Sequence, residues 1–136
     1  MELDITGLDG LEGWIKKFEH SGELMLELSE KLASETVDLV KDGFDKESDT
    51  YGKKWLATAR GGEILSDTGA LKTSWKVKSA TRAQFKVDGS EPYASFHQGG
   101  TKHMAARPMV PDGKLPASWL ADYSDAADEL FEEHFG

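Results

Sequence analysis

The chain has 136 residues and a formal net charge of -9, with 38% hydrophobic residues, 30% charged residues and no cysteine. This length and composition are typical of one globular domain with a hydrophobic core, and they exclude a disordered polypeptide. The lack of cysteine excludes disulfides, cysteine-ligated zinc and a cysteine nucleophile, and the acidic balance disfavours broad affinity for nucleic acid.

No apolar run approaches the roughly 20 residues that a bilayer-spanning helix requires. The first residues lack the basic and apolar stretches of a signal peptide. The sequence therefore predicts synthesis in the cytoplasm and no membrane partner.

The charge is unevenly distributed along the chain. The stretch after Trp119 contains no lysine or arginine but six acidic residues: Asp122, Asp125, Asp128, Glu129, Glu132 and Glu133. The middle of the chain is basic, with Lys72, Lys76, Lys78, Arg82, Lys86, Lys102 and Arg107. Acidic and basic surfaces on one small domain would let copies attract one another, although solvated faces without a partner explain the same pattern.

A long amphipathic helix is predicted from about residue 21 to 44, because leucines and valines recur there at helical spacing. Ser21 is expected to cap the N-terminal end of this helix, and Gly43 is expected to end the helix by adopting the left-handed conformation. Glu27 and Lys31 have the spacing of an i,i+4 ion pair. Such a helix is expected to pack across a sheet, and binding of a partner helix is the alternative.

The segments on either side of this helix are less regular. Apolar residues at three- and four-residue steps predict a short helix within residues 1–20. Residues 45–62 are expected to form an exposed connection, in which a turn at Gly52 folds Tyr51 and Trp55 onto the domain.

Strict alternation of apolar and polar residues predicts a β-hairpin at the centre of the chain, preceded by a short helical turn after Asp67-Thr68-Gly69. Four residues are expected to face the core: Trp75, Val77, Phe85 and Val87. The outer face is expected to be basic, with Lys76, Lys78 and Lys86. Like charges opposite one another repel slightly, so an acidic partner would be favourable there, although solubility alone explains the pattern.

The chain is predicted to end in an extended edge segment at 107–111 and a helix from about 116 to 134. Together, these elements predict an α+β fold in a single domain of residues 1–136. An antiparallel sheet built around the central hairpin would be flanked by a long N-terminal helix and a C-terminal helix.

Four short motifs occur in a fixed order over about residues 51–111. They are Tyr51-Gly52-Lys53-Lys54-Trp55, the segment 64–74 with Asp67-Thr68-Gly69, Tyr93-Ala94-Ser95-Phe96-His97-Gln98-Gly99-Gly100, and Ala106-Arg107-Pro108-Met109-Val110. This ordered set resembles the phage virion morphogenesis (tail-completion) family. That family includes the Mu-like G tail proteins and is related to head–tail connector and tail-terminator proteins.

The resemblance implies a structural phage or prophage protein without catalysis, metal or cofactor. Such proteins act at tail completion or head–tail joining, typically as rings, with a hexameric ring among the options. The implied partners are further copies of the chain and tail tube or connector proteins, in the host cytoplasm during assembly and then in the tail or neck of the virion. Residues predicted to contact a subunit or partner are Lys76, Lys78, Lys86, His97, Arg107 and Met109. Acidic helices of a neighbour are the preferred partner of the basic hairpin face, ahead of DNA in a lumen.

Two other interpretations, a metal site and an aspartic protease site, have weaker support than this structural role. His97 and His103 lack the helical spacing of a metal site. Asp67-Thr68-Gly69 matches the aspartic protease triplet, but the residues after it are unlike the apolar run that such a site needs. The alternative function is an acidic inhibitor or DNA mimic that binds a nucleic-acid enzyme, which the acidic C-terminal helix suggests and the basic hairpin opposes.

Overall fold

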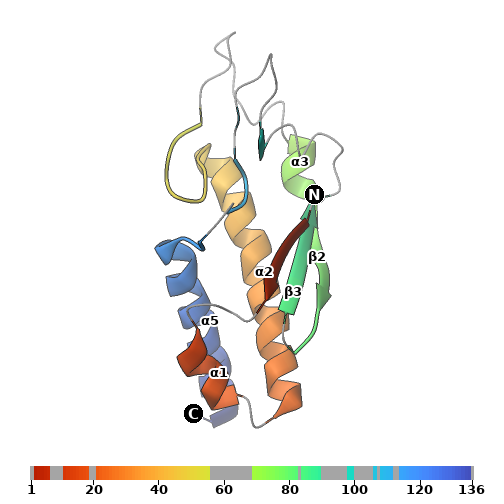
Figure 1. The fold of residues 1–136 in the computed structure, drawn as a ribbon, viewed down its shortest axis with the longest axis vertical. Coiled ribbons are helices and arrows are strands. Elements are labelled where there is room, and N and C mark those ends of the chain that lie inside the picture. Colours follow the sequence, from red (N-terminus) through yellow and green to blue (C-terminus); the bar gives the residue numbers. More distant parts are fainter. Residues whose placement is uncertain are drawn as a thin grey trace.

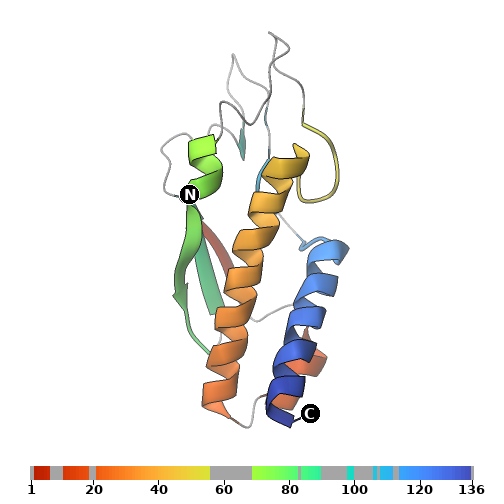
Figure 2. The ribbon, with the colours of Figure 1, turned by 180° about the vertical axis from the view of Figure 1, so that it is seen from behind.

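The computed structural model describes residues 2–6, 11–18, 21–55, 69–82, 84–89, 98–99, 106, 108–111 and 114–135. In chain order the elements are β1 (Glu2–Thr6), α1 (Glu12–Phe18), α2 (Gly22–Lys46), α3 (Gly69–Ser74), β2 (Trp75–Ala80), β3 (Gln84–Gly89) and α5 (Ala117–Phe135) (Figure 1). The sheet lies on one side of α2, and α5 runs antiparallel to α2 on its other side (Figure 2). The predicted α+β fold, with a central hairpin and two flanking helices, is confirmed.

Helix α2 begins where the sequence predicts and ends slightly later. The Ser21 hydroxyl accepts a hydrogen bond from the Leu24 N–H, 3.3 Å away, which satisfies one of the unpaired donors of the first turn. The left-handed residue at the C-terminal end is Glu47 (φ 51°, ψ 47°). The predicted stop at Gly43 is therefore wrong, because the carbonyls of the last turn accept from the N–H groups of Glu47 and Ser48 instead.

Two polar contacts between side chains connect helices α2 and α5. Glu27 and Lys31, the predicted i,i+4 partners, each pair with α5 instead. Lys31 Nζ lies 3.1 Å from Glu129 Oε2, and His134 Nε2 lies 2.8 Å from Glu27 Oε2. These pairs are at the surface, so the register of the two helices depends mainly on the apolar contacts beneath them.

The sheet has the strand order β1-β3-β2 within the described residues, and both pairings are antiparallel. Strand β1 was not predicted, although Leu3 and Ile5 alternate with polar residues. The segment is short, and its partner β3 lies far away in the sequence, so local periodicity alone does not single it out. β3 is the central strand, and Phe85 and Val87 on its inner face are fully buried against α2.

The hairpin of β2 and β3 differs from the prediction at two points. Val77 was expected to face the core, but its side chain is 41% exposed, because Val77 lies on an edge strand next to a register shift. The expected repulsion between lysines is also wrong. Lys76 lies opposite Asp88, and Lys86 lies opposite Ser79.

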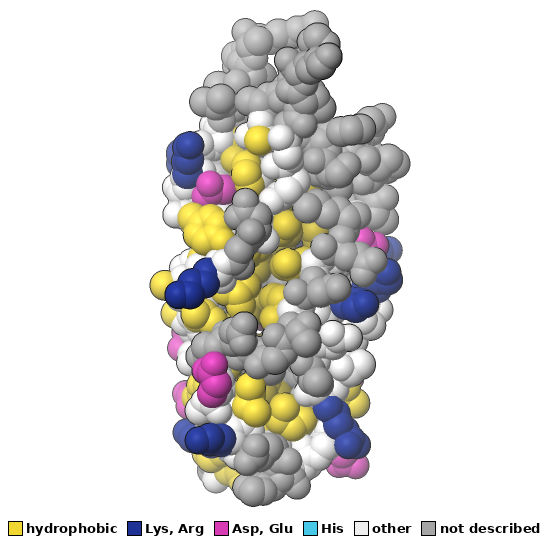
Figure 3. All heavy atoms as spheres, viewed as in Figure 1, with side chains coloured by type: hydrophobic (Ala, Val, Ile, Leu, Met, Phe, Trp, Pro, Cys, Tyr) yellow, Lys and Arg dark blue, Asp and Glu magenta, His cyan; other side chains and the backbone are white. Residues whose placement is uncertain are grey.

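Aromatic and hydroxyl groups hold the core together between the sheet, α2 and α5. The Phe85 ring packs edge-on against Tyr123, and the Tyr123 hydroxyl donates to Thr36 Oγ1, which in turn donates to the Leu32 carbonyl. Burial raises the pKa of Tyr123, so this phenol stays protonated. In Figure 3, hydrophobic side chains gather down the middle of this face of the molecule.

Gly89 at the end of β3 is explained by close packing. A Cβ at this position would lie 2.6 Å from a ring carbon of Trp75, which is its partner across the hairpin and is 1% exposed. Glycine therefore lets the indole cover the strand directly.

Candidate functional site

Three of the four sequence motifs meet near the C-terminal end of α2. Trp55 is 7% exposed, and its ring packs edge-on against Phe44 with the ring centroids 5.4 Å apart. Its Nε1–H donates to the Pro108 carbonyl at 2.9 Å, across 53 residues of sequence. The first and last motifs are therefore joined directly. We call this contact region, consisting of Trp55, Gln98 and residues 108–110, the motif junction.

Gln98 connects the third motif to the same junction. Its Oε1 accepts from the N–H groups of Met109 (2.7 Å) and Val110 (3.2 Å), and its Nε2–H donates to the Val110 carbonyl at 3.0 Å. The side chain thus satisfies backbone groups as a neighbouring strand would. The segment 107–111 was predicted to lie at a sheet edge, but its described residues lie outside the sheet. Met109 and Val110 are buried.

A tight turn presents Trp55 to this junction. Asp49 Oδ1 accepts from the N–H groups of both Tyr51 and Lys53 at 2.9 Å, and Gly52 has a φ of 92°, which glycine adopts without strain. The predicted turn at Gly52 and the inward position of Trp55 are confirmed. Tyr51 was also predicted to fold onto the domain, but its side chain is 52% exposed. Its hydroxyl donates a hydrogen bond to the Lys114 carbonyl at 2.6 Å.

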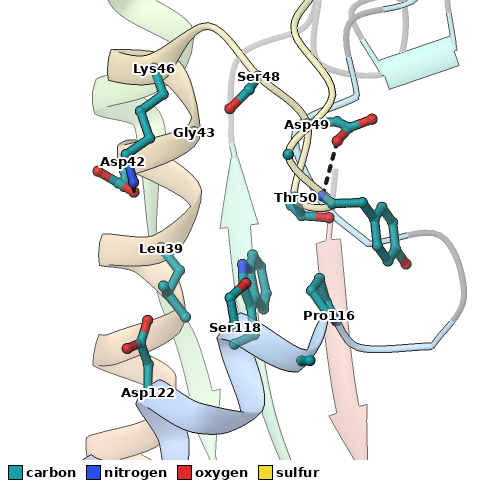
Figure 4. Close-up of a pocket in the computed structure, with 14 residues that line it drawn as sticks. Leu39, Asp42, Gly43, Lys46, Ser48, Asp49, Thr50, Pro116, Ser118 and Asp122 are labelled. Atoms are coloured by element: carbon teal, nitrogen blue, oxygen red, sulfur yellow. Dashed lines mark hydrogen bonds and ion pairs between the residues drawn. The ribbon is translucent and has the colours of Figure 1, made fainter.

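A pocket of about 420 Å³ lies beside the turn, between the end of α2 and the start of α5 (Figure 4). Its polar lining includes Asp42 and Asp122, and Asp42 Oδ2 pairs with Lys46 Nζ at 2.8 Å. The hydrogen bond that the Lys46 ammonium donates to Asp42 raises the pKa of Lys46. In the described part of the chain no group of three or more His, Asp or Glu residues could hold a metal ion. The lining suits a cationic group better than an anion.

Below the pocket, carboxylates crowd the surface where α2 and α5 run side by side. We call this surface the acidic ridge; it consists of Glu35, Asp38, Asp42, Asp122 and Glu129. Burial raises the pKa of Glu35, and Asp122, Asp38 and Glu129 raise it further, while Lys31 opposes them. The ridge therefore carries more negative charge than its neighbouring lysines balance.

Replacing Glu35 with glutamine is expected to stabilise the protein slightly at pH 7. The folded-state pKa of Glu35 lies above the unfolded value of about 4.5, so the folded state binds more protons and loses stability as pH rises through that window. Glu35 is only half-buried, so solvent screening limits the gain to roughly 0.5 kcal/mol or less. Thermal unfolding should show a higher Tm at pH 7 and no difference near pH 3. Glu30→Gln, on the exposed face of α2, is the matched control; a lower Tm for Glu35→Gln at pH 7 would contradict the repulsion.

The structure separates the residues that the sequence proposed as contacts. Lys76 and Lys78 are exposed on the edge strand β2, whereas Lys86 is half-buried on the central strand. Met109 is 2% exposed and belongs to the motif junction, so its side chain is not part of the surface. His97 and Arg107, like His103 and the Asp67-Thr68 pair, lie outside the described residues.

Two features of the site were missed by reasoning from the sequence. Gln98 stands within the third motif, but nothing local indicated that it would bind residues 109–110. The acidic ridge had a clearer signal, since Glu35, Asp38 and Asp42 recur at spacings that place them on one face of α2. Their proximity to α5 depends on how the two helices pack.

In the ranges that the structure describes, no helix is long and apolar enough to cross a membrane. No protein-family model matches this chain, and neither a curated protein nor a solved structure matches it.

Proposed function

We propose that this chain is a structural subunit of phage or prophage virion morphogenesis that acts at tail completion or head–tail joining as part of a ring. The observation that supports this most is the motif junction. Motifs that carry the family resemblance, far apart in the sequence, bind one another through Trp55, Gln98 and the segment 108–110. Their order therefore has a physical basis in one packed unit, which favours the resemblance over coincidence.

The surface of the chain is also suited to assembly. In the sheet formed by the described residues, β2 is an edge strand with exposed Lys76 and Lys78, and edge strands are ready-made contact surfaces. Several polar and charged groups of the described residues act in a helix cap, a turn and ion pairs. A structural role requires no further chemistry from them.

The experiment is complementation of a phage or prophage that lacks this chain. The wild-type chain should restore complete virions and should be detected in purified particles by mass spectrometry. Arg107→Glu is expected to leave the fold intact but to block virion completion, since the Arg-Pro motif is proposed to dock. Normal particle yield from Arg107→Glu would contradict the docking role, and complete virions without the chain would contradict the proposed function.

The exposed carboxylates of α5 support a second candidate, an acidic inhibitor or DNA mimic. Of its acidic residues, Asp125, Asp128, Glu129, Glu132 and Glu133 are all exposed. Neutralising these residues together with Asp122 separates the two functions. Unchanged assembly with lost inhibition of a nucleic-acid enzyme would favour the mimic, whereas lost assembly would favour the ring subunit.

A further inference from the structure

The β2 edge, formed by Lys76, Val77 and Lys78, is suited to a partner other than another β2 strand. All three side chains are exposed, and the alternation of a strand places Lys76 and Lys78 on one face and Val77 on the other. Two β2 edges brought together would bring lysines close to lysines, and the register shift between Val77 and Ser79 interrupts regular strand pairing. The edge therefore favours an acidic surface of a different shape.

The acidic ridge has the matching charge and dimensions. Glu35, Asp38 and Asp42 extend over roughly 10 Å of α2 at 1.5 Å per residue. Lys76 and Lys78, two residues apart on a strand, are separated by roughly 7 Å. Burial raises the pKa of Glu35, and neighbouring carboxylates raise it further, so cations brought to the ridge would relieve the repulsion among these carboxylates.

The two surfaces belong to different elements: the β2 edge to the sheet, and the acidic ridge to α2 and α5. In Figures 1 and 2 the sheet lies on one side of α2, and α5 lies on the other. One subunit therefore carries both halves of a complementary contact. Contacts between two different surfaces of identical chains are head to tail, and they form a ring when the rotation closes.

We propose that the β2 edge of one subunit docks on the acidic ridge of a second copy, with Lys76 and Lys78 facing Asp38, Asp42 and their neighbours. This inference rests on the proposed function, because it specifies the contact that would build the ring. Since the contact is electrostatic, assembly should weaken as ionic strength rises.

A charge-swap experiment tests this pairing. Both Lys76→Glu/Lys78→Glu and Asp38→Lys/Asp42→Lys should weaken self-association by more than roughly tenfold, measured by analytical ultracentrifugation across concentration at low salt. An equimolar mixture of the two variants should assemble again, because each supplies the charge that the other lacks. The four-fold variant that carries all these changes should also assemble by itself.

The matched control reverses two exposed lysines elsewhere, Lys16→Glu/Lys114→Glu, and should assemble like the wild type. Circular dichroism melting confirms that each variant is folded.

Three results would each overturn the pairing: a wild type that stays monomeric at every concentration, double variants that assemble as well as the wild type, or a mixture of variants that fails to assemble. If the wild type assembles but the swaps have no effect, only this interface fails. If the swaps behave as expected but virions form without the chain, the proposed function fails and the interface stands.

Discussion

Replacing Trp55 with alanine is expected to lower the free energy of unfolding by about 3–5 kcal/mol, in the range of large-to-small aromatic substitutions in cores. The indole is 7% exposed, packs edge-on against Phe44 and donates to the Pro108 carbonyl. The substitution would leave a cavity at the end of α2 and remove the direct bond between the first and last motifs. Urea denaturation followed by circular dichroism measures the loss.

Trp55→Phe separates packing from hydrogen bonding. Phenylalanine keeps an aromatic ring against Phe44 but has no N–H for Pro108, so the loss should be much smaller than for alanine, with about 1 kcal/mol from the hydrogen bond. Tyr51→Phe, which removes an exposed hydroxyl from the same turn, controls for general disturbance of the loop. A Trp55→Ala variant as stable as the wild type would show that the motif junction contributes nothing to the fold.

Gln98→Ala is expected to cost about 2–4 kcal/mol, because three backbone groups of Met109 and Val110 lose their partner at once. The most specific measurement is amide hydrogen exchange. The N–H groups of Met109 and Val110 should exchange faster in the variant, while the amides of β3 should change only by the global loss of stability.

Gln98→Glu is the matched variant. Glutamate keeps an oxygen that can accept from the N–H groups of Met109 and Val110, but it has no N–H to donate to the Val110 carbonyl. Gln98→Glu should therefore lose only the bond to the Val110 carbonyl, whereas Gln98→Ala loses all three bonds. Protection of the Met109 amide should be retained better than in Gln98→Ala. Equal, fast exchange of this amide in both variants, or no change in either, would contradict the role of Gln98 as a substitute strand.

Much of the fold could be predicted because it depends on local patterns. The stripe of α2, its cap at Ser21 and the alternation of β2 and β3 are all encoded within one element. The features that were predicted wrongly or not at all depend on contacts between residues far apart in the sequence. β1 pairs with a strand far along the chain, and Val77 becomes exposed only because β2 is the edge of the sheet.

Less of the candidate site could be predicted from the sequence, because it also depends on long-range contacts. The motifs could be recognised, but the contacts that join them at Trp55 and Gln98 are long-range and depend on tertiary packing. Met109 looked like a contact residue by its place in a motif, but in the structure it is buried. The acidic ridge requires α2 and α5 to be adjacent, which a pattern on either helix alone does not fix.

The most direct test of the proposed role is to measure the mass of the purified chain in solution across concentration, with electron microscopy of the same sample. The account predicts closed rings of identical subunits at low salt, with the β2 edge of each subunit against α2 and α5 of the next. A strict monomer at every concentration, with no rings in the images, would contradict it.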